Sequence, residues 1–299
     1  MTPENGLPGN AQPENLQPDH MPPENSPSGD SPTGPSQPEL MPPAIPTPEA
    51  GGLKPDRRLW GAWPTVGLGL VVFIVNQIAQ AVIAIIFAVI LIIERQNTGT
   101  AFDPFQFADQ LTTNGLMLSI ALIVSAAAGI GLIILFIKIR KGISILEYLA
   151  LHRVNPKTVL TMLAIVIVIL GLSFGVDQVV KTPPETDIIA NAYKNTGWPV
   201  LFWLAVVVFA PAFEESLFRG FLFAGLKQSA IGPVGTIILT ALVFAALHAL
   251  QYGVSIALAM ILVLGIVLGM VRYRTGSLWS SIALHSFWNL LQMVILTIQ

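Results

Sequence analysis

The sequence predicts an all-α, polytopic membrane protein: a transmembrane helical bundle of about seven spans that follows a disordered, proline-rich N-terminal tail. Of the 299 residues, 53% are hydrophobic and 11% are charged, whereas soluble globular proteins have about 25% charged residues. The mean hydropathy is +0.69, and several apolar runs reach the roughly 20 residues that a helix needs to cross a hydrocarbon core. The chain has no cysteine, which excludes disulfides, thiolate metal sites and a catalytic thiol.

Residues 1–59 are the predicted tail. Residues 1–53 contain fourteen prolines, seven carboxylates and no lysine or arginine, and the triplet Pro-Glu-Asn begins at residues 3, 13 and 23. Such a segment has too little apolar surface to offset the entropy of ordering, so we expect a disordered, acidic, cytoplasmic tail. Its composition favours a solvated segment without a specific task, and the alternative is an arm that binds a partner.

Residues 60–299 are the predicted transmembrane domain, with seven hydrophobic spans. Their expected ranges are 64–93, 115–137, 158–178, 198–226, 235–251, 255–272 and 278–298. Cytoplasmic loops retain lysine and arginine. With seven spans, eleven basic residues (Arg272 among them) collect on one side and three on the other, while Arg219 lies within a span. This asymmetry predicts a multi-pass protein of the cell membrane with a cytoplasmic N-terminus and a C-terminus outside.

Polar residues that are costly in a membrane concentrate in the last hundred residues. Three spans carry them: Glu214, Glu215 and Arg219 in the fourth, His248 in the fifth, and His285 and Asn289 in the seventh. At 1.5 Å per residue, His285 lies about 16 Å from the cytoplasmic flank, and Glu214, His248 and Asn289 lie about 20–22 Å from it. This shared depth indicates one common site.

Helical geometry separates the two glutamates. Glu215 and Arg219 are four residues apart on one face, so we expect them to pair and to offset each other's burial. Glu214 points about 140° away from Arg219 and has no such partner in its own helix, which leaves it for proton transfer. Upstream, Pro211 deprives the carbonyl of Val207 of its helical donor and is expected to kink the helix.

Two small-residue pairs have the spacing of helix-packing faces, Gly171 with Gly175 and Gly265 with Gly269. The first pair also fits G-x-S-x-G, the nucleophile elbow of serine hydrolases. That elbow requires a strand-to-helix turn, whereas this segment lies within a predicted span. We therefore interpret both pairs as packing faces.

The ordered motifs Glu-Glu-x-x-x-Arg, Phe-x-x-x-His and His-x-x-x-Asn resemble the CPBP family of intramembrane proteases. That family includes the CAAX prenyl endopeptidases and bacterial bacteriocin-processing and Abi-type proteins, and the resemblance covers residues 198–299 as a catalytic core. It implies an intramembrane endopeptidase that hydrolyses a peptide bond with activated water in a cavity within the membrane. By the same resemblance Glu214 is the general base, assisted by His248, and His285 with Asn289 receives the oxyanion.

The resemblance also implies partners. They are the lipid bilayer and a peptide or membrane-protein substrate, prenylated or not, with no nucleic acid. The sequence leaves two other functions open. One is a transporter or proton-relay protein that uses the same buried cluster, and the other is a non-catalytic scaffold of the same fold.

Catalysis without a bound cofactor is the favoured hypothesis, and zinc is the alternative. Glu214, His248 and His285 are the residues that would ligate zinc, as a two-histidine, one-carboxylate site with an open water position. Against zinc, Asn289 shares a face with His285, and an amide is a poor zinc ligand but a good oxyanion donor. In addition, no carboxylate lies beside either histidine along its own helix to orient it.

Overall fold

The computed structural model describes residues 58–99, 101–180, 188–253 and 255–298, and every regular element among them is a helix. Apart from its last two residues, the predicted tail lies outside the described residues. The helices that follow the predicted spans are α1 (Ala62–Thr98), α3 (Gly115–Ile139), α5 (Pro156–Val180), α7 (Pro199–Leu204), α8 (Ala210–Glu215), α9 (Phe223–Leu226), α10 (Gly232–Tyr252), α11 (Ile256–Thr275) and α12 (Leu278–Ile298). The turns η2 (Ala205–Phe209) and η3 (Ser216–Leu222) are π-helical and join α7, α8 and α9 into one run.

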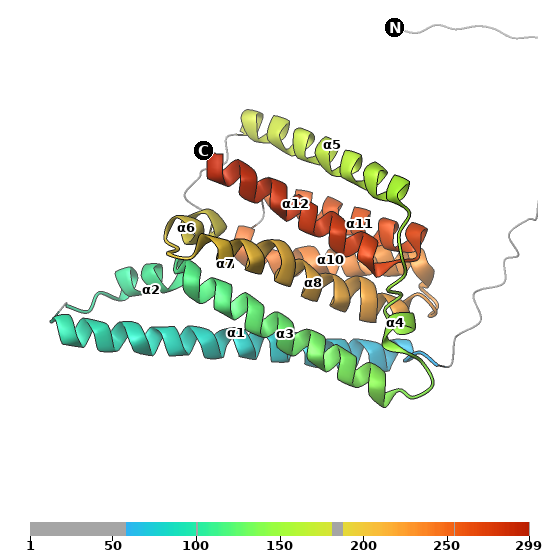
Figure 1. The fold of residues 1–299 in the computed structure, drawn as a ribbon, viewed down its shortest axis with the longest axis horizontal. Helices are drawn as coiled ribbons and strands as arrows, with labels where there is room; N and C mark the ends of the chain where they lie inside the picture. Colours follow the sequence, from blue (N-terminus) through green and yellow to red (C-terminus); the bar gives the residue numbers. More distant parts are fainter. Residues whose placement is uncertain (1–57, 100, 181–187, 254, 299) are drawn as a thin grey trace, which may run out of the picture. The chain divides into compact units, whose positions relative to one another are not determined.

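Six helical segments in the described ranges are long and apolar enough to cross a membrane. They are Ala62–Thr98, Gly115–Ile139, Pro199–Leu226, Gly232–Ala249, Ile256–Thr275 and Leu278–Ile298. A shorter apolar stretch, Pro156–Leu172, forms the first part of α5, where the sequence predicts the remaining span. Helix α1 begins at one end of the bundle and α12 ends at the opposite end (Figure 1). The predicted class, a multi-pass helical membrane protein, is confirmed.

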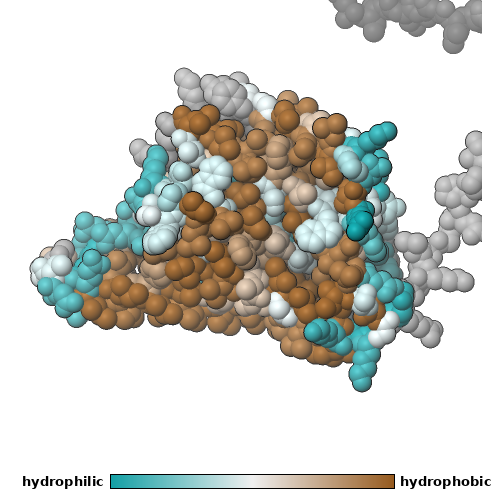
Figure 2. Space-filling view, viewed as in Figure 1, coloured by the Kyte–Doolittle hydropathy of each residue, from teal (hydrophilic) through white to brown (hydrophobic). Residues whose placement is uncertain are grey.

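Three short helices in the connections were not predicted from the sequence: α2 (Pro104–Thr112), α4 (Ile145–Tyr148) and α6 (Ile188–Lys194). Side-chain caps begin the first two. The Asp103 carboxylate accepts the amide hydrogens of Phe105 and Gln106, and the Ser144 hydroxyl accepts that of Glu147. The face of the described bundle shown in Figure 2 is mostly apolar across its middle and hydrophilic at both ends, as expected of a membrane-spanning protein.

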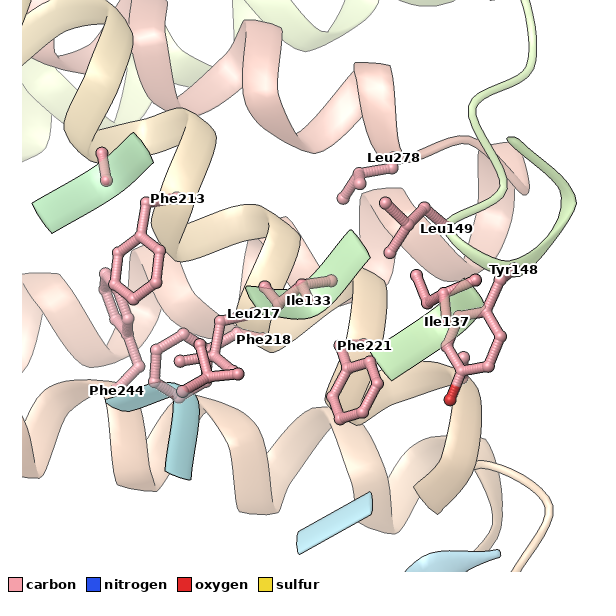
Figure 3. Close-up of a cluster of buried hydrophobic side chains, with 13 residues drawn as sticks. Ile133, Ile137, Tyr148, Leu149, Phe213, Leu217, Phe218, Phe221, Phe244 and Leu278 are labelled. Atoms are coloured by element: carbon pink, nitrogen blue, oxygen red, sulfur yellow. The ribbon is translucent and has the colours of Figure 1, made fainter. Parts of the chain in front are cut away.

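The run from α7 to α9 lies at the centre of the bundle and contacts α1, α3, α10, α11 and α12. Its apolar face fills the main hydrophobic cluster, which includes Phe213, Phe218 and Phe244, and the rings of Phe218 and Phe244 lie 5.4 Å apart between centroids (Figure 3). Helix α3 approaches this run closely at Gly129, where an added Cβ would collide with the Phe213 ring. The absence of a side chain at Gly129 therefore helps to set the position of α8.

The two glycine pairs behave differently. Gly265 and Gly269 of α11 face Ala241 and Ile237 of α10, and added Cβ atoms would lie 3.2 Å and 2.9 Å from them. The packing interpretation of that pair is confirmed. At Gly171 and Gly175 an added Cβ would meet nothing within 4 Å among the described side chains, so this pair does not form a packing face against the described helices of the chain. Both of these glycines lie within helix α5, which excludes the strand-to-helix turn of a nucleophile elbow.

Candidate active site

The two glutamates lie on α8, between two turns in which the backbone hydrogen-bond pattern changes. π-helical turns are rare and are frequently found at functional sites. At the end of η2 the amide of Ala210 donates to the carbonyl of Ala205, five residues back. The next residue is Pro211, which has no N–H to donate. The segment that carries Glu214 and Glu215 is therefore flanked by irregular backbone on both sides.

Glu215 and Arg219 form the predicted ion pair. Nη1 of Arg219 donates to Oε1 of Glu215 at 3.0 Å, and both side chains are fully buried. Nη2 of Arg219 donates to the carbonyl of Gly265 at 2.8 Å, and the guanidinium lies 4.9 Å from the centre of the Phe244 ring. Arg219 thus joins α8 to α10 and α11 and supplies the counter-charge that allows a carboxylate to be buried there.

His285 of α12 lies between the two glutamates. Its Nδ1 is 2.9 Å from Oε1 of Glu215, and its Nε2 is 3.7 Å from Oε2 of Glu214. The imidazole is buried, whereas the side chain of Glu214 is 25% exposed. Because an ionised carboxylate only accepts hydrogen bonds, Nδ1 carries a proton and Nε2 is the nitrogen directed toward Glu214.

The contact between Glu215 and His285 was not predicted from the sequence. The two residues are seventy positions apart and belong to different helices. Along each histidine's own helix the sequence places no carboxylate that could orient the ring. The structure provides one from α8, so this argument against a zinc site is wrong.

His248 of α10 joins the site through Phe244, four residues earlier in the same helix. Its Nδ1 lies 2.8 Å from the carbonyl of Phe244. A carbonyl only accepts, so Nδ1 carries the ring proton and a neutral His248 keeps a lone pair on Nε2. The Phe244 ring lies 4.5 Å from the His248 ring and 5.9 Å from the His285 ring, between centroids. Phe244 is therefore the apolar contact shared by the two histidines.

Asn289 lies one turn beyond His285 in α12, at the level of η2. Its Nδ2 donates to the backbone carbonyl of Val206 at 2.9 Å, and the side chain is half-buried. From the sequence, Pro211 was expected to deprive the carbonyl of Val207 of its donor. Asn289 instead binds the carbonyl of Val206, one residue earlier, because the π-helical turn shifts the backbone hydrogen bonds by one residue.

Arg272 of α11 was counted from the sequence among the basic residues of the cytoplasmic side. In the structure its side chain is buried, and its Nε donates to the carbonyl of Arg219 at 3.0 Å. The amide of Phe223 bonds to the carbonyls of Phe218 and Gly220 on either side of that carbonyl. Arg272 therefore completes the hydrogen bonding of η3, a role that the sequence did not predict.

Residues 196–291 match the family model of the Rce1-like proteins, described as type II CAAX prenyl endopeptidases. The resemblance to the CPBP family is confirmed. This CPBP-like segment is about a third of the chain and contains all six candidate site residues. No curated protein and no solved structure gives a significant match to the chain. The match supports a CAAX-type intramembrane protease in a multi-pass helical membrane protein.

The CPBP-like segment does not gather the three residues named for zinc into a coordination set. Within the ranges that the structure describes, no group of three histidine or carboxylate side chains is placed to hold a metal ion. Glu214 and His285 approach each other, but Nδ1 of His285 is engaged by Glu215 and Nδ1 of His248 by a backbone carbonyl. The Nε2 atoms of the two rings remain for a ligand, as they do in histidines that bind a metal, so these hydrogen bonds do not exclude zinc.

Proposed function

We propose that the chain is an intramembrane endopeptidase in which Glu214 and His248 activate a water molecule. One observation carries the proposal: Glu214 and His285 approach to 3.7 Å from two different helices, inside the segment that matches the CAAX endopeptidase model. A carboxylate and an imidazole at this distance can act on the two sides of one carbonyl group, one on the attacking water and the other on the carbonyl oxygen.

The protonation states follow from the hydrogen bonds. Glu215 requires a proton on Nδ1 of His285, so His285 can donate from Nε2 as well only as an imidazolium. The formal charges of the cluster then add to zero: two negative carboxylates balance the Arg219 guanidinium and that imidazolium. A neutral cluster is the arrangement that burial within a membrane favours.

The reaction is proposed to run in two steps. Oε2 of Glu214 takes a proton from water while the water oxygen bonds to the carbonyl carbon, and Nε2 of His248 accepts the second hydrogen of that water as a hydrogen bond. The resulting oxyanion is held by Nε2–H of His285 and by the N–H of Asn289 that Val206 does not use. The C–N bond then breaks, the proton on Glu214 passes to the leaving nitrogen, and a carboxyl group and an amine are formed.

The proposed substrate is a membrane-associated peptide or a membrane protein. Extended backbone is not tolerated in lipid, so the peptide must enter a cavity that also holds water. The description of the matching family model names prenyl endopeptidases. A prenylated carboxyl-terminal peptide is therefore the first substrate to test, beside the same peptide without the lipid.

The test uses the purified full chain in lipid nanodiscs with both peptides, each carrying a fluorophore and a quencher. Wild type and Glu94→Gln are expected to cleave, and Glu214→Gln is expected not to. Glu94 is a matched control because it is an exposed carboxylate on α1. Proton flux into liposomes without cleavage would support the transporter alternative instead. If the protein neither cleaves either peptide nor conducts protons, the result would support the non-catalytic scaffold.

A further inference from the structure

The carbonyl of Val206 has no donor within its own helix. The amide that would reach it in an α-helix is that of Ala210, which donates instead to Ala205. The amide that would reach it in a π-helix belongs to residue 211, which is proline. A backbone carbonyl within a membrane must be satisfied by some other group, and here that group is the Asn289 amide, at 2.9 Å.

This bond fixes the direction of the Asn289 side chain. A carboxamide is planar and has two N–H bonds on one nitrogen. When one of them is held by the Val206 carbonyl, the plane of the group and the direction of the second N–H are set. Asn289 is four residues from His285 on one face of α12, so the second N–H lies on the same side of the helix as the imidazole.

We propose that Pro211 is a positioning residue for the oxyanion site. By withholding a backbone N–H, it makes the Val206 carbonyl the anchor that holds Asn289 beside His285. The inference rests on the proposed function for its catalytic consequence, but the hydrogen-bond exchange itself does not require that function. The reaction chemistry remains with Glu214, His248 and His285, and Pro211 acts only through Asn289.

A second site in the same helical run supports this logic. At η3 the carbonyl of Arg219 is bound by the side chain of Arg272, and the amide of Phe223 donates to carbonyls on either side of it. Both π-helical turns therefore present a backbone carbonyl to a side chain from another helix. At η3 the bond joins two arginines away from the reacting groups, whereas at η2 it is made by a residue of the predicted oxyanion pair.

Replacing Pro211 with alanine restores the missing donor. In the α-helical pattern the amide of Ala210 donates to the carbonyl of Val206, and the new amide at position 211 donates to that of Val207. In the π-helical pattern the new amide donates to the carbonyl of Val206 directly. In either case the Val206 carbonyl gains a backbone donor and no longer depends on Asn289, which weakens the bond that holds this side chain. We expect kcat to fall about 10- to 100-fold, as for a misplaced oxyanion donor, with KM changed by less than about twofold. The melting temperature should be unchanged or raised.

Pro199→Ala is the matched control. Pro199 occupies the first turn of α7, where a missing N–H deprives no helical carbonyl of a donor. Its kcat and melting temperature should match wild type. Unchanged kcat in Pro211→Ala would overturn the proposal. So would a fall in kcat that accompanies a lowered melting temperature, since Pro211 would then be needed for folding rather than for positioning.

A thermal double-mutant cycle tests the anchor without any substrate. Asn289→Ala in the wild-type background leaves the Val206 carbonyl unpaired and should lower the melting temperature. In the Pro211→Ala background the same change should have no such effect, because the backbone then supplies the donor. Equal losses in the two backgrounds would refute the exchange. If the cycle shows coupling but no variant or wild type cleaves peptides, the proposed function fails and the anchor stands.

Discussion

Replacing Glu215 with glutamine removes the charge that faces the buried Arg219 guanidinium and the His285 imidazole. Oε1 of Glu215 lies 3.0 Å from Nη1 of Arg219 and 2.9 Å from Nδ1 of His285, and none of the three side chains is more than 5% exposed. Glutamine keeps the shape but not the charge, so Arg219 stays buried without its counter-charge. Breaking a buried pair in this way costs about 3–5 kcal/mol of unfolding free energy. At about 2–4 °C per kcal/mol, the melting temperature should fall by about 6–20 °C.

The assay is thermal unfolding of the purified variants in detergent, with peptide hydrolysis measured in parallel. Glu147→Gln is the control, because Glu147 pairs with Arg58 at 2.7 Å while 45% exposed, and such surface pairs contribute about 0–1 kcal/mol. The double variant with Arg219→Gln should recover stability but not hydrolysis, since the glutamine oxygen at position 215 can accept from Nδ1 of His285 but supplies no negative charge to favour an imidazolium. A Glu215→Gln melting temperature equal to that of Glu147→Gln would refute the assignment of Glu215 as a required counter-charge.

The remaining predictions concern the base, the topology, the metal and the packing of α8. Glu214→Gln should abolish hydrolysis with a melting temperature within about 2 °C of wild type, because this carboxylate is partly exposed and unpaired with Arg219. A reporter fused after Gln299 should lie outside the cell membrane, and a reporter fused before Trp60 should lie inside. If both reporters lie on the same side, the number of spans is even and the predicted topology is wrong. Dialysis of the active protein against a strong chelator should leave hydrolysis unchanged, and elemental analysis should find less than one zinc per chain. Gly129→Ala should destabilise by about 1–3 kcal/mol through overpacking, and Gly131→Ala, which has open space, should not.

Contacts within one helix were predictable from the sequence, because helical periodicity fixes which residues share a face. The pairing of Glu215 with Arg219 followed from a spacing of four, and the structure confirms it. The separation of Glu214 from that pair followed from the same geometry. The all-α membrane class followed from composition and the length of the apolar runs, since few other structures satisfy the backbone in lipid.

Contacts between helices were not predictable, because they depend on how the helices rotate against each other. Nothing in the local sequence of α12 indicates that Nδ1 of His285 meets Glu215. The effect of Pro211 was predicted only in part: the lost donor was foreseen, but the one-residue shift that directs Asn289 to Val206 depends on a π-helical turn. The position of Arg272 near a helix end likewise does not indicate that its side chain is buried against η3.

The central claim, that Glu214 directs water to a peptide bond, is tested most directly by hydrolysis in heavy-oxygen water. The nanodisc-embedded wild type and the Glu94→Gln control are incubated with the prenylated and the plain peptide, and the products are analysed by mass spectrometry. We predict one heavy oxygen atom in each new carboxyl terminus and no such product from Glu214→Gln. Labelled product formed by Glu214→Gln at the wild-type rate, or no labelled product from wild type with either peptide, would contradict the account.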